Sequence, residues 1–507
     1  MRPTTVEILT ATAVSVMLIC CARPAVAQES RPEPSPERVM PERLSRQVAP
    51  SPDKLWRPPP LQEYINVLKA TERLPIDPQK RYDLLELIDI AQRSNPETRT
   101  AWEAARQAAI GIGLVQSEYF PMLTVSVLGG YESIAVPAPK DVAPTGFFRV
   151  DLQQGVPMLN LRWLLLDFGR RGNALDVAKE RLMSANLAFN RKHQEIIFRV
   201  QRAFLALTSL QRKIFVAQSS LDAARAVREA SEDQLRTGLA TLPEVSLSRQ
   251  QEAQAAFDLE DVRATERDAQ VTLAEAIGIT PTTAIQVTDF SALPAPATLE
   301  DSVEKVIDHA LENRPDLIAK VAVVRAKEAE ARRARAAYFP TLSLNGNLSS
   351  ILGQARITGG IANTGWFSAA QPSYGIGLFL EWNIFEGGAT RRRVELAEAE
   401  RRAAESEVTA ARDRAVSEVW KAYTDVHLAA RRLDVAAALV TASEQSYESI
   451  LESYRHGLST LTDLLASRRE LSRARFAEVD TKLQLLNASA GLAFTTGDSP
   501  QGQGPGR

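Results

Sequence analysis

Two long stretches of the chain, residues 173–237 and 389–456, contain neither glycine nor proline. At about 1.5 Å per residue, each stretch predicts a single helix of about 100 Å. In the second stretch, small or apolar residues recur mostly at alternating spacings of three and four, and only Arg401 and Glu444 interrupt the series. Its members are Val394, Ala397, Ala404, Val408, Ala411, Ala415, Val419, Ala422, Val426, Ala430, Leu433, Ala437, Val440, Tyr447, Leu451 and Tyr454. This heptad spacing indicates a left-handed supercoil with neighbouring helices.

Each long helix is expected to end at a tight turn and return as an antiparallel partner. Gly238 and Gly457 interrupt the helical pattern, and helical patterns resume over 243–277 and 461–496. A helix, a glycine turn and a returning helix form an αα-hairpin. A further helical pattern covers 84–118, with a short helix before Pro96 and a longer one after it. Together, 84–118 and 243–277 have about the length of one long helix, so these two shorter segments are expected to lie end to end beside a long helix.

Alternation of period two predicts strands. It is visible over 124–131 and 159–163, which gives a first hairpin over 121–168 with a loop over 137–146. A second hairpin is expected over 340–386, with a loop over 353–372. Four strands cannot close around a lumen, because about eight are needed, and a sheet with free edges invites pairing with further copies of the chain.

The two halves repeat each other at a constant offset of 219 residues. The matching landmarks are Asn95-Pro96 with Arg314-Pro315, Tyr119-Phe120-Pro121 with Tyr338-Phe339-Pro340, Trp163 with Trp382, Gly169 with Gly388, Gly238 with Gly457, and Gly278 with Gly497. A fixed period of this kind indicates two copies of one structural unit. Trp163 and Trp382 stand near strand ends, where an aromatic girdle would meet a membrane interface; the alternative is a small soluble sheet with both tryptophans in its core.

These patterns divide the chain into segments. We expect a signal peptide over 1–27, a Pro-rich strap over 28–81, a first repeat over 82–280, a linker over 281–300, a second repeat over 301–497 and a flexible tail over 498–507. The signal peptide is predicted from Arg2, an apolar stretch and the small residues Ala25 and Ala27. The alternative is a lipoprotein signal with a lipid on Cys21. No later run approaches the roughly 18 apolar residues of a membrane-spanning helix.

Composition narrows the function further. The net charge of −2 implies no polyanionic partner such as nucleic acid, and the chain has only four histidines and two cysteines. Both cysteines lie in the first 27 residues, so thiol chemistry and disulfides are not expected in the body of the protein. Because there is no nucleophile motif, phosphate-binding loop or paired set of metal ligands, we expect neither an enzyme nor a cofactor.

Taken together, the motifs resemble those of the TolC-like outer membrane factors over residues 82–497. The resemblance rests on the paired proline helix starts, the paired Tyr-Phe-Pro strand entries, the run from Trp382 to Gly388, and Tyr454-Arg455-His456-Gly457 followed by Leu464. The first copy departs slightly, with Leu166-Asp167-Phe168-Gly169 in place of the Phe-Glu-Gly-Gly form. The implied fold class is mainly α with a β-barrel part: long antiparallel coiled-coil helices and four transmembrane strands per chain, assembled as a homotrimer.

The resemblance also implies a function and partners. The protein would lie in the outer membrane of a Gram-negative-type cell, in contact with membrane lipid, and extend into the periplasm. It would be the passive exit duct of a tripartite system that also contains a periplasmic adaptor and an inner-membrane transporter. Small-molecule or drug efflux is the leading expectation; type I protein secretion and metal efflux are alternatives, and a periplasmic coiled-coil scaffold is the alternative from another class.

Site residues follow from the same resemblance. The turns Thr237-Gly238-Leu239 and His456-Gly457-Leu458 are similar to the tips with which family members contact adaptors, although glycine is also expected at any such turn. Asp463, with Glu244 in the first copy and Tyr454 beside the second tip, would form the gate, and three copies of Asp463 would favour cations. The family's second gate aspartate falls on Ala466 and the arginine partner of its gating tyrosine on Ser459, so both of those contacts are in doubt.

Overall fold

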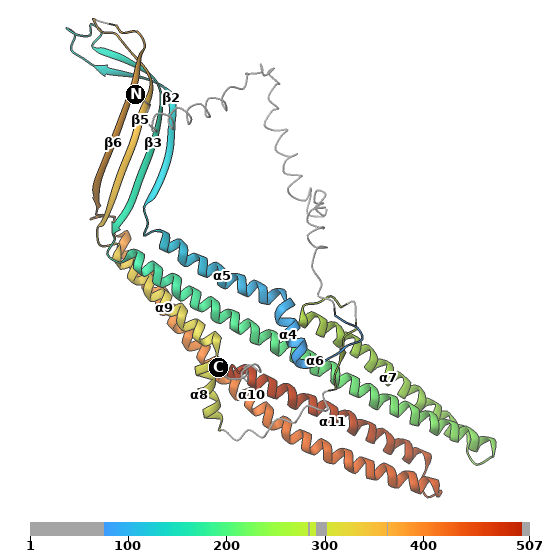
Figure 1. Ribbon diagram of the computed structural model, residues 1–507. Coiled ribbons are helices and arrows are strands. Elements are labelled where there is room, and N and C mark those ends of the chain that lie inside the picture. Colours follow the sequence, from blue (N-terminus) through green and yellow to red (C-terminus); the bar gives the residue numbers. More distant parts are fainter. Residues whose placement is uncertain (1–75, 282–283, 290–301, 362, 499–507) are drawn as a thin grey trace, which may run out of the picture. The chain divides into compact units, whose positions relative to one another are not determined.

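The structure is a computed structural model that describes residues 76–281, 284–289, 302–361 and 363–498. The predicted signal peptide with Cys21, most of the strap and most of the tail and the linker lie outside these ranges. The elements of the first repeat are α4 (Leu84–Ser94), α5 (Pro96–Ser117), β2 (Met122–Pro137), β3 (Phe147–Leu166), α6 (Arg170–Arg236) and α7 (Leu242–Ile277). Those of the second are α8 (Val303–Asn313), α9 (Pro315–Ala336), β5 (Thr341–Thr358), β6 (Phe367–Glu381), α10 (Ala389–Arg455) and α11 (Leu461–Thr496) (Figure 1).

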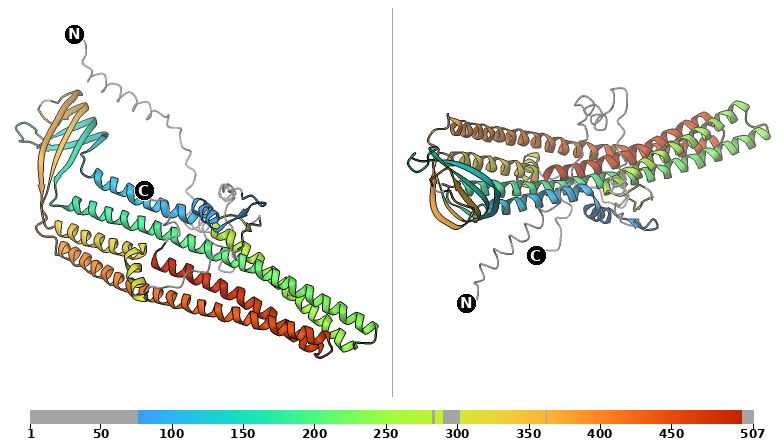
Figure 2. Two further views of the ribbon diagram at one scale, coloured as in Figure 1. Left: turned by 60° about the horizontal axis from the view of Figure 1, so that its bottom comes forward. Right: turned by 90° about the horizontal axis from the view of Figure 1, so that it is seen from above.

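The helices pack side by side around α6. This helix contacts α5 and α9 along its first part and α7 and α11 along its second, while α10 contacts α9, α8 and α11 (Figure 2). Next to the sheet, the helices therefore lie in the order α5, α6, α9, α10, which we call the upper layer. Toward the turns at Gly238 and Gly457 they lie in the order α7, α6, α11, α10, the lower layer. In both layers α10 lies at one margin, and the opposite margin is α5 or α7. Among the helices of the described residues, none combines the length and apolarity needed to cross a bilayer.

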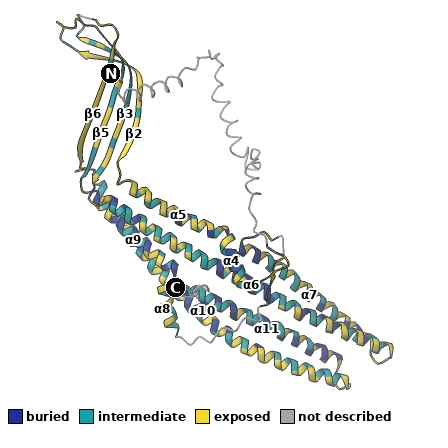
Figure 3. Ribbon diagram, in the orientation of Figure 1, coloured by how far each residue is buried: buried dark blue, intermediate teal, exposed yellow. Residues whose placement is uncertain are grey.

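The heptad seam predicted for α10 lies against the neighbouring helices. Ala404, Ala415, Val419 and Val426 are buried, and most other members of the series are half-buried (Figure 3). Alanine at these positions keeps the side chains short, so the helix axes can approach closely.

The four long strands form one antiparallel sheet in the order β2-β3-β5-β6, so β2 and β6 are its edges. The strands are longer than the alternation indicated, and the expected loop over 353–372 is wrong at both ends, because β5 continues to Thr358 and β6 starts at Phe367. Gly353 is needed within a strand, since a Cβ there would collide with the carbonyl oxygen of Gln153. Pro372 is tolerated because β6 is an edge strand.

The structure contains a second, very short sheet that the sequence pattern does not predict. β1 (Arg81–Tyr82) pairs in parallel with β4 (Gln286–Val287), although the first falls at the end of the expected strap and the second in the expected linker. Tyr82 and Val287 join the largest hydrophobic core, together with Leu87 and Ile277. A two-residue strand carries too few positions for a period-two pattern, so its sequence gives no signal.

The repeated landmarks have the same physical role in both copies. The indole Nε1 of Trp163 donates to the carbonyl oxygen of Tyr119 at 2.9 Å, and Trp382 donates to that of Tyr338 at 3.0 Å. Gly278 ends α7 at φ 85°, where a Cβ would lie 2.9 Å from the Cα of Asn95. Gly497 ends α11 at φ 86°, where a Cβ would lie 2.9 Å from the carbonyl oxygen of Asn313. Each glycine therefore permits both the left-handed helix end and the close approach of the residues that precede Pro96 or Pro315.

The junction between β3 and α6 contains a buried ion pair. The Nε of Arg171 lies 3.0 Å from Oδ2 of Asp167, and the guanidinium also donates to the carbonyl oxygens of Leu164, Leu165 and Glu118. Both side chains are 8 % exposed. At the equivalent place in the second copy, Thr390 donates to Glu386 instead.

We expect Arg171→Ala to destabilise this junction strongly, because it leaves the Asp167 carboxylate buried without its partner, a loss of about 3–5 kcal/mol. The measurement is the thermal unfolding midpoint of the purified protein. Thr390→Ala is the matched control, since it removes one hydrogen bond of about 1 kcal/mol. Equal midpoints for the two variants would show that the ion pair does not hold the junction.

Candidate functional site

The turns at the ends of the two long helices have the same backbone geometry. At the first, the N–H of Gly238 donates to the carbonyl oxygen of Leu235 and that of Leu239 to the carbonyl oxygen of Gln234 at 2.8 Å. At the second, Gly457 donates to Tyr454 and Leu458 to Ser453, also at 2.8 Å. These are the two hydrogen bonds of a Schellman motif. Both glycines have positive φ, 78° and 73°, so the motif explains why glycine stands at each turn.

The residues after these glycines leave the turns uncovered. Leu239 and Leu458 are each 81 % exposed, although the residue at this position of a Schellman motif often packs back on its own helix. A Cβ added at Gly238 or Gly457 would meet nothing within 4 Å. Each tip therefore presents an exposed apolar side chain and an open backbone surface.

Tyr454, which is predicted to belong to the gate beside the second tip, connects the α10–α11 hairpin with the α6–α7 hairpin. Its hydroxyl donates to Oε1 of Gln234 on α6 at 3.4 Å. Burial raises the pKa of Tyr454, and the negative charge of Glu244 on α7 raises this pKa further. The structure thus brings together Tyr454 and Glu244, as well as Gln234, which no sequence motif singles out. No hydrogen bond of Ser459 joins this group within the described residues.

The predicted gate carboxylates both cap helices. Oδ2 of Asp463 accepts hydrogen bonds from the Thr460 hydroxyl at 2.6 Å and from the Thr460 N–H at 3.1 Å. These bonds hold the pKa of Asp463 below its usual range. Glu244 accepts equivalent bonds from Thr241 at the start of α7. Each acid is thus the third helical residue of a capping box, and Asp463 also borders a groove between α10 and α11 that Ala466 lines.

In the half next to the helices, the four-stranded sheet has one apolar and one polar face. Directly opposed residues form apolar rows that cross it: Val125, Leu159, Leu348 and Tyr374; Leu123, Leu161, Gly346 and Ile376; and Trp163, Leu344 and Leu378. The intervening rows on the other face carry Thr124, Asn160 and Asn347, and then Arg162 and Asn345. Tyr374 is 86 % exposed and Val125 and Ile376 are each 74 % exposed. Apolar residues on one face and polar residues on the other are typical of strands between lipid and a water-filled lumen.

Exposed apolar side chains also gather on the helices at the margins of both layers. They are Trp102, Ile110 and Leu114 on α5, Phe257 and Val271 on α7, and Leu396, Trp420, Leu428, Val435 and Leu439 on α10. The edge strands β2 and β6 lie at the same two margins. Exposed large apolar side chains along both margins are consistent with an interface there.

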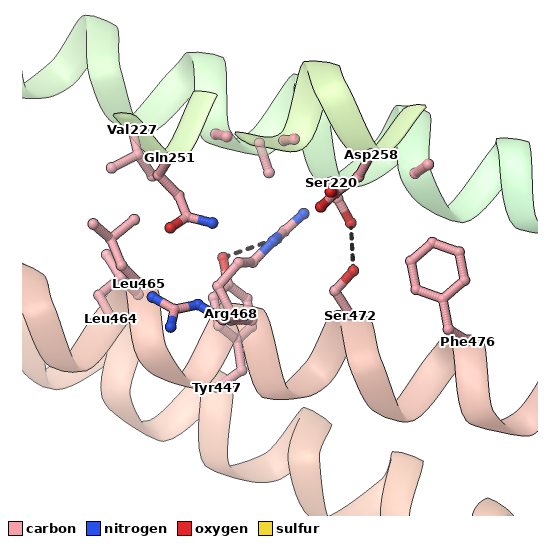
Figure 4. A pocket seen from close by; sticks show the side chains of 15 residues that line it. Ser220, Val227, Gln251, Asp258, Tyr447, Leu464, Leu465, Arg468, Ser472 and Phe476 are labelled. Atoms are coloured by element: carbon pink, nitrogen blue, oxygen red, sulfur yellow. Dashed lines mark hydrogen bonds between the residues drawn. The ribbon is translucent and has the colours of Figure 1, made fainter. Parts of the chain in front are cut away.

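One strong contact between the hairpins was not predicted. Nη1 of Arg468 on α11 donates to the hydroxyl of Tyr447 on α10 at 3.1 Å (Figure 4). Nη2 donates to the carbonyl oxygen of Ser219 on α6, also at 3.1 Å. Arginine is common along these helices, so the sequence does not distinguish Arg468 from its neighbours. In the described part of the chain, no group of three or more His, Cys, Asp or Glu side chains could hold a metal ion.

Comparisons with known proteins agree with this geometry. The sequence model of the outer membrane efflux protein family matches residues 87–279 and 306–498. The protein CyaE of Bordetella pertussis is 25 % identical over 82 % of this chain and 84 % of its own length. The pyoverdine export outer membrane protein OpmQ of Pseudomonas aeruginosa is 29 % identical over 58 % of this chain and 59 % of its own. The solved structure of the outer-membrane channel OprN superposes with a TM-score of 0.69 at 22 % identity, covering 85 % of this chain and 95 % of that one.

The chain therefore belongs to the outer membrane efflux protein family. The predicted family, the fold class, the location in the outer membrane and the function in efflux are confirmed by these matches. The relatives are channel proteins of efflux systems. The assignments of the tips and of the gate are not tested by the comparisons and stay predictions.

Proposed function

We propose that three copies of the chain form one channel, in which β6 of each protomer pairs with β2 of the next. Twelve strands then close a barrel, and the apolar rows of the sheet face lipid while Thr124, Asn160 and Arg162 face the lumen. Two observations support this arrangement: both edge strands lack a partner within the described chain, and exposed apolar side chains follow the same margins through the helical layers.

The free edges β2 and β6 carry the proposal, and the mass of the assembly tests it. The protein extracted from outer membranes should have a detergent-corrected mass of three mature chains. A protein that is released by carbonate without detergent, as a monomer, would instead be a periplasmic coiled-coil scaffold.

Within this channel, the tips Thr237-Gly238-Leu239 and His456-Gly457-Leu458 contact a periplasmic adaptor, which couples the duct to an inner-membrane transporter. The exposed leucines and open glycines at both turns support this assignment. The channel itself is passive, since the transporter supplies the energy. Because the relatives are channel proteins of efflux systems, we infer that the protein is not an enzyme.

The position of Asp463 in the first turn of α11, close to the tip at Gly457, supports its assignment to a charged constriction. Three copies around the axis place three carboxylates at the tip end, and rings of carboxylates favour cations. We expect Asp463→Asn to reduce the cation preference, measured as the reversal potential of bilayer-reconstituted protein under a KCl gradient. Asp434→Asn removes an exposed charge on α10, far from the tip in sequence, and should leave that potential unchanged. If both variants behave alike, Asp463 does not line the constriction.

The pH dependence of this selectivity follows from the hydrogen bonds of Thr460. Because they hold the pKa of Asp463 below its usual range, the carboxylate stays charged as the pH falls. Cation preference should therefore persist from pH 7 to about 4, the usual pKa of aspartate, and decline only below it. Loss of the preference between pH 6 and 5 would assign it to another group.

Small molecules are the cargo that the comparisons favour. Relatives include the pyoverdine export protein OpmQ and the solvent efflux pump protein SrpC of Pseudomonas putida, which is 23 % identical over 80 % of this chain. Deleting the gene should increase the accumulation of small amphipathic compounds in the cell. If accumulation is unchanged while a secreted protein is lost from the medium, type I secretion is the function; increased sensitivity to metal ions alone would indicate metal efflux.

A further inference from the structure

The two repeats match element by element at the offset of 219 residues. Adding 219 to the bounds of α5, α6 and α7 gives the bounds of α9, α10 and α11 without a shift (Figure 1). The two strand hairpins share one register as well, because Thr124 faces Asn160 and the equivalent Ser343 faces Phe379. Each position in the helices and strands of one repeat therefore has a defined structural equivalent in the other.

The boundary between the repeats lies along one side of α6, where this helix contacts α9 and α11 (Figure 2). The equivalent side belongs to α10, and its partners would be the equivalents of α9 and α11, which are α5 and α7. Within one chain, however, α5 and α7 lie at the margin opposite to α10. In the described part of the chain, that side of α10 therefore stays uncovered, and the first repeat of another protomer is the surface that matches it.

Burial differs between the repeats in the way that a missing neighbour predicts. Three buried positions of α6 correspond to exposed apolar side chains on α10: Val177 to Leu396, Ser209 to Leu428, and Val216 to Val435. Because α9 and α11 cover α10 as α5 and α7 cover α6, the cover that α10 lacks is the equivalent of the boundary between the repeats. Covering these side chains would remove apolar surface from water, which favours association.

An aromatic residue on α7 provides the matching surface. Its equivalent on α11, Phe476, borders the cavity between the hairpins (Figure 4) and packs against a cluster that contains Ala217 and Leu221 of α6. The residue on α7 is Phe257, which is 69 % exposed. The positions of α10 equivalent to Ala217 and Leu221 hold small or apolar residues, Ala436 and Val440. Phe257 of one protomer can therefore pack on α10 of another as Phe476 packs on α6.

An ion pair across the boundary between the repeats has an equivalent with the same charges. Nζ of Lys213 on α6 lies 2.6 Å from Oδ1 of Asp480 on α11. The equivalent residues are Arg432 on α10 and Asp261 on α7. Both are exposed, and within the described residues neither side chain takes part in an ion pair. The two charges thus stand at the positions where a second protomer would bring them together.

The equivalence of charges holds at this level and not along the whole boundary. Closer to the sheet, Arg181 on α6 pairs with Glu330 on α9, but the equivalent residues are Glu400 and Gly111. Glu400 pairs with Lys327 of its own chain instead. The preserved pair of Arg432 and Asp261 is therefore the one that singles out a specific contact between protomers.

We propose that the boundary between protomers repeats the boundary between the two repeats of one chain, with α10 of one protomer against α5 and α7 of the next. In this arrangement Arg432 forms an ion pair with Asp261 of the next protomer, about 37 Å along α10 from the turn at Gly457. Such a contact joins two different surfaces, so it closes into a ring. The inference rests on the proposed trimer and specifies how its helices meet.

The first test links the two positions chemically in outer membranes. Arg432→Cys with Asp261→Cys, treated with a short bis-maleimide, should give covalent dimers and trimers on a denaturing gel, because α10 and α7 lie at opposite margins of one chain. Arg432→Cys with Glu275→Cys is the control for register, since Glu275 is also exposed on α7 but lies about 21 Å further along the helix. Equal linking by both pairs would overturn the proposed register.

The second test reverses the charges. Arg432→Glu should weaken trimer association on the order of tenfold, because attraction becomes repulsion at each of three boundaries, and adding Asp261→Arg should restore it. The measurement is the fraction of trimer that survives heating in SDS. Arg431→Glu is the matched control, since its equivalent on α6, Arg212, stays exposed beside the internal boundary, and it should leave that fraction unchanged.

The outcomes distinguish a failure of this contact from a failure of the trimer. Restoration by the double reversal supports the ion pair, and it also excludes misfolding of Arg432→Glu as the cause of the loss. If the unaltered protein is trimeric but the double reversal is no better than Arg432→Glu and the cysteine pair does not link, the protomers meet in another way. If the unaltered protein is monomeric, the channel proposal itself fails.

Discussion

The double variant Gly238→Trp with Gly457→Trp is expected to abolish export while the trimer still assembles. Both glycines have positive φ, so each replacement introduces strain of about 1–2 kcal/mol. This strain is local, because a Cβ at either position meets no atom within 4 Å. The indole rings would occupy the surface on which the adaptor is proposed to bind. The measurements are cargo export in cells and trimer mass after extraction.

Gly146→Trp is the control for backbone strain. Gly146 has φ 79° in the loop between β2 and β3, and a Cβ there also meets nothing within 4 Å. It should match each tip variant in strain and leave export intact. Normal export by the double tip variant would overturn the docking assignment, and loss of export by Gly146→Trp would show that strain alone is sufficient.

Val125→Arg is expected to prevent insertion of the sheet into the outer membrane. Val125 lies on the apolar face of β2 and is 74 % exposed, so the replacement removes little packing within the protomer. An arginine facing lipid near the middle of a bilayer costs about 2–4 kcal/mol, and three copies raise this to about 6–12 kcal/mol per trimer. The measurement is the fraction of folded trimer in purified outer membranes.

The neighbouring residue provides the control for this variant. Thr124 is on the same strand but on the polar face, opposite Asn160, so Thr124→Arg places the same charge in the proposed lumen. Trimers of Thr124→Arg should form normally, and their ion selectivity should shift toward anions. If Thr124→Arg fails to insert and Val125→Arg inserts, the faces of the sheet have been assigned the wrong way round.

The sequence predicted the fold where one signal extends over many residues. The two long helices are evident because glycine and proline are absent over 173–237 and 389–456, and the duplication is evident from its fixed offset. Strand ends are less well predicted, since Gly353 and Pro372 suggest a loop but lie within β5 and β6. The pairing of β1 with β4 depends on two segments about 200 residues apart, and neither is long enough to show a pattern.

The same difference between local and long-range signals applies to the residues of the candidate site. Local turn chemistry is encoded in a few adjacent residues, so the sequence alone places Gly238 and Gly457 at turns. Contacts between hairpins have no such local signal, because Gln234 and Arg468 resemble many other polar residues on the surfaces of these helices. Asp463 shows a further difficulty: a carboxylate three residues after a threonine is expected to cap a helix, and it does so here whether or not it also faces a pore.

The position of α10 at one margin of both helical layers has a consequence for how such a channel opens. Within its own protomer α10 contacts mainly α8, α9 and α11, and the apolar residues on its other side, Trp420, Leu428 and Val435 among them, remain exposed. In the proposed trimer these residues pack on the next protomer. An outward movement of one hairpin in that trimer would displace its neighbour, so movements of the three tips would be coupled.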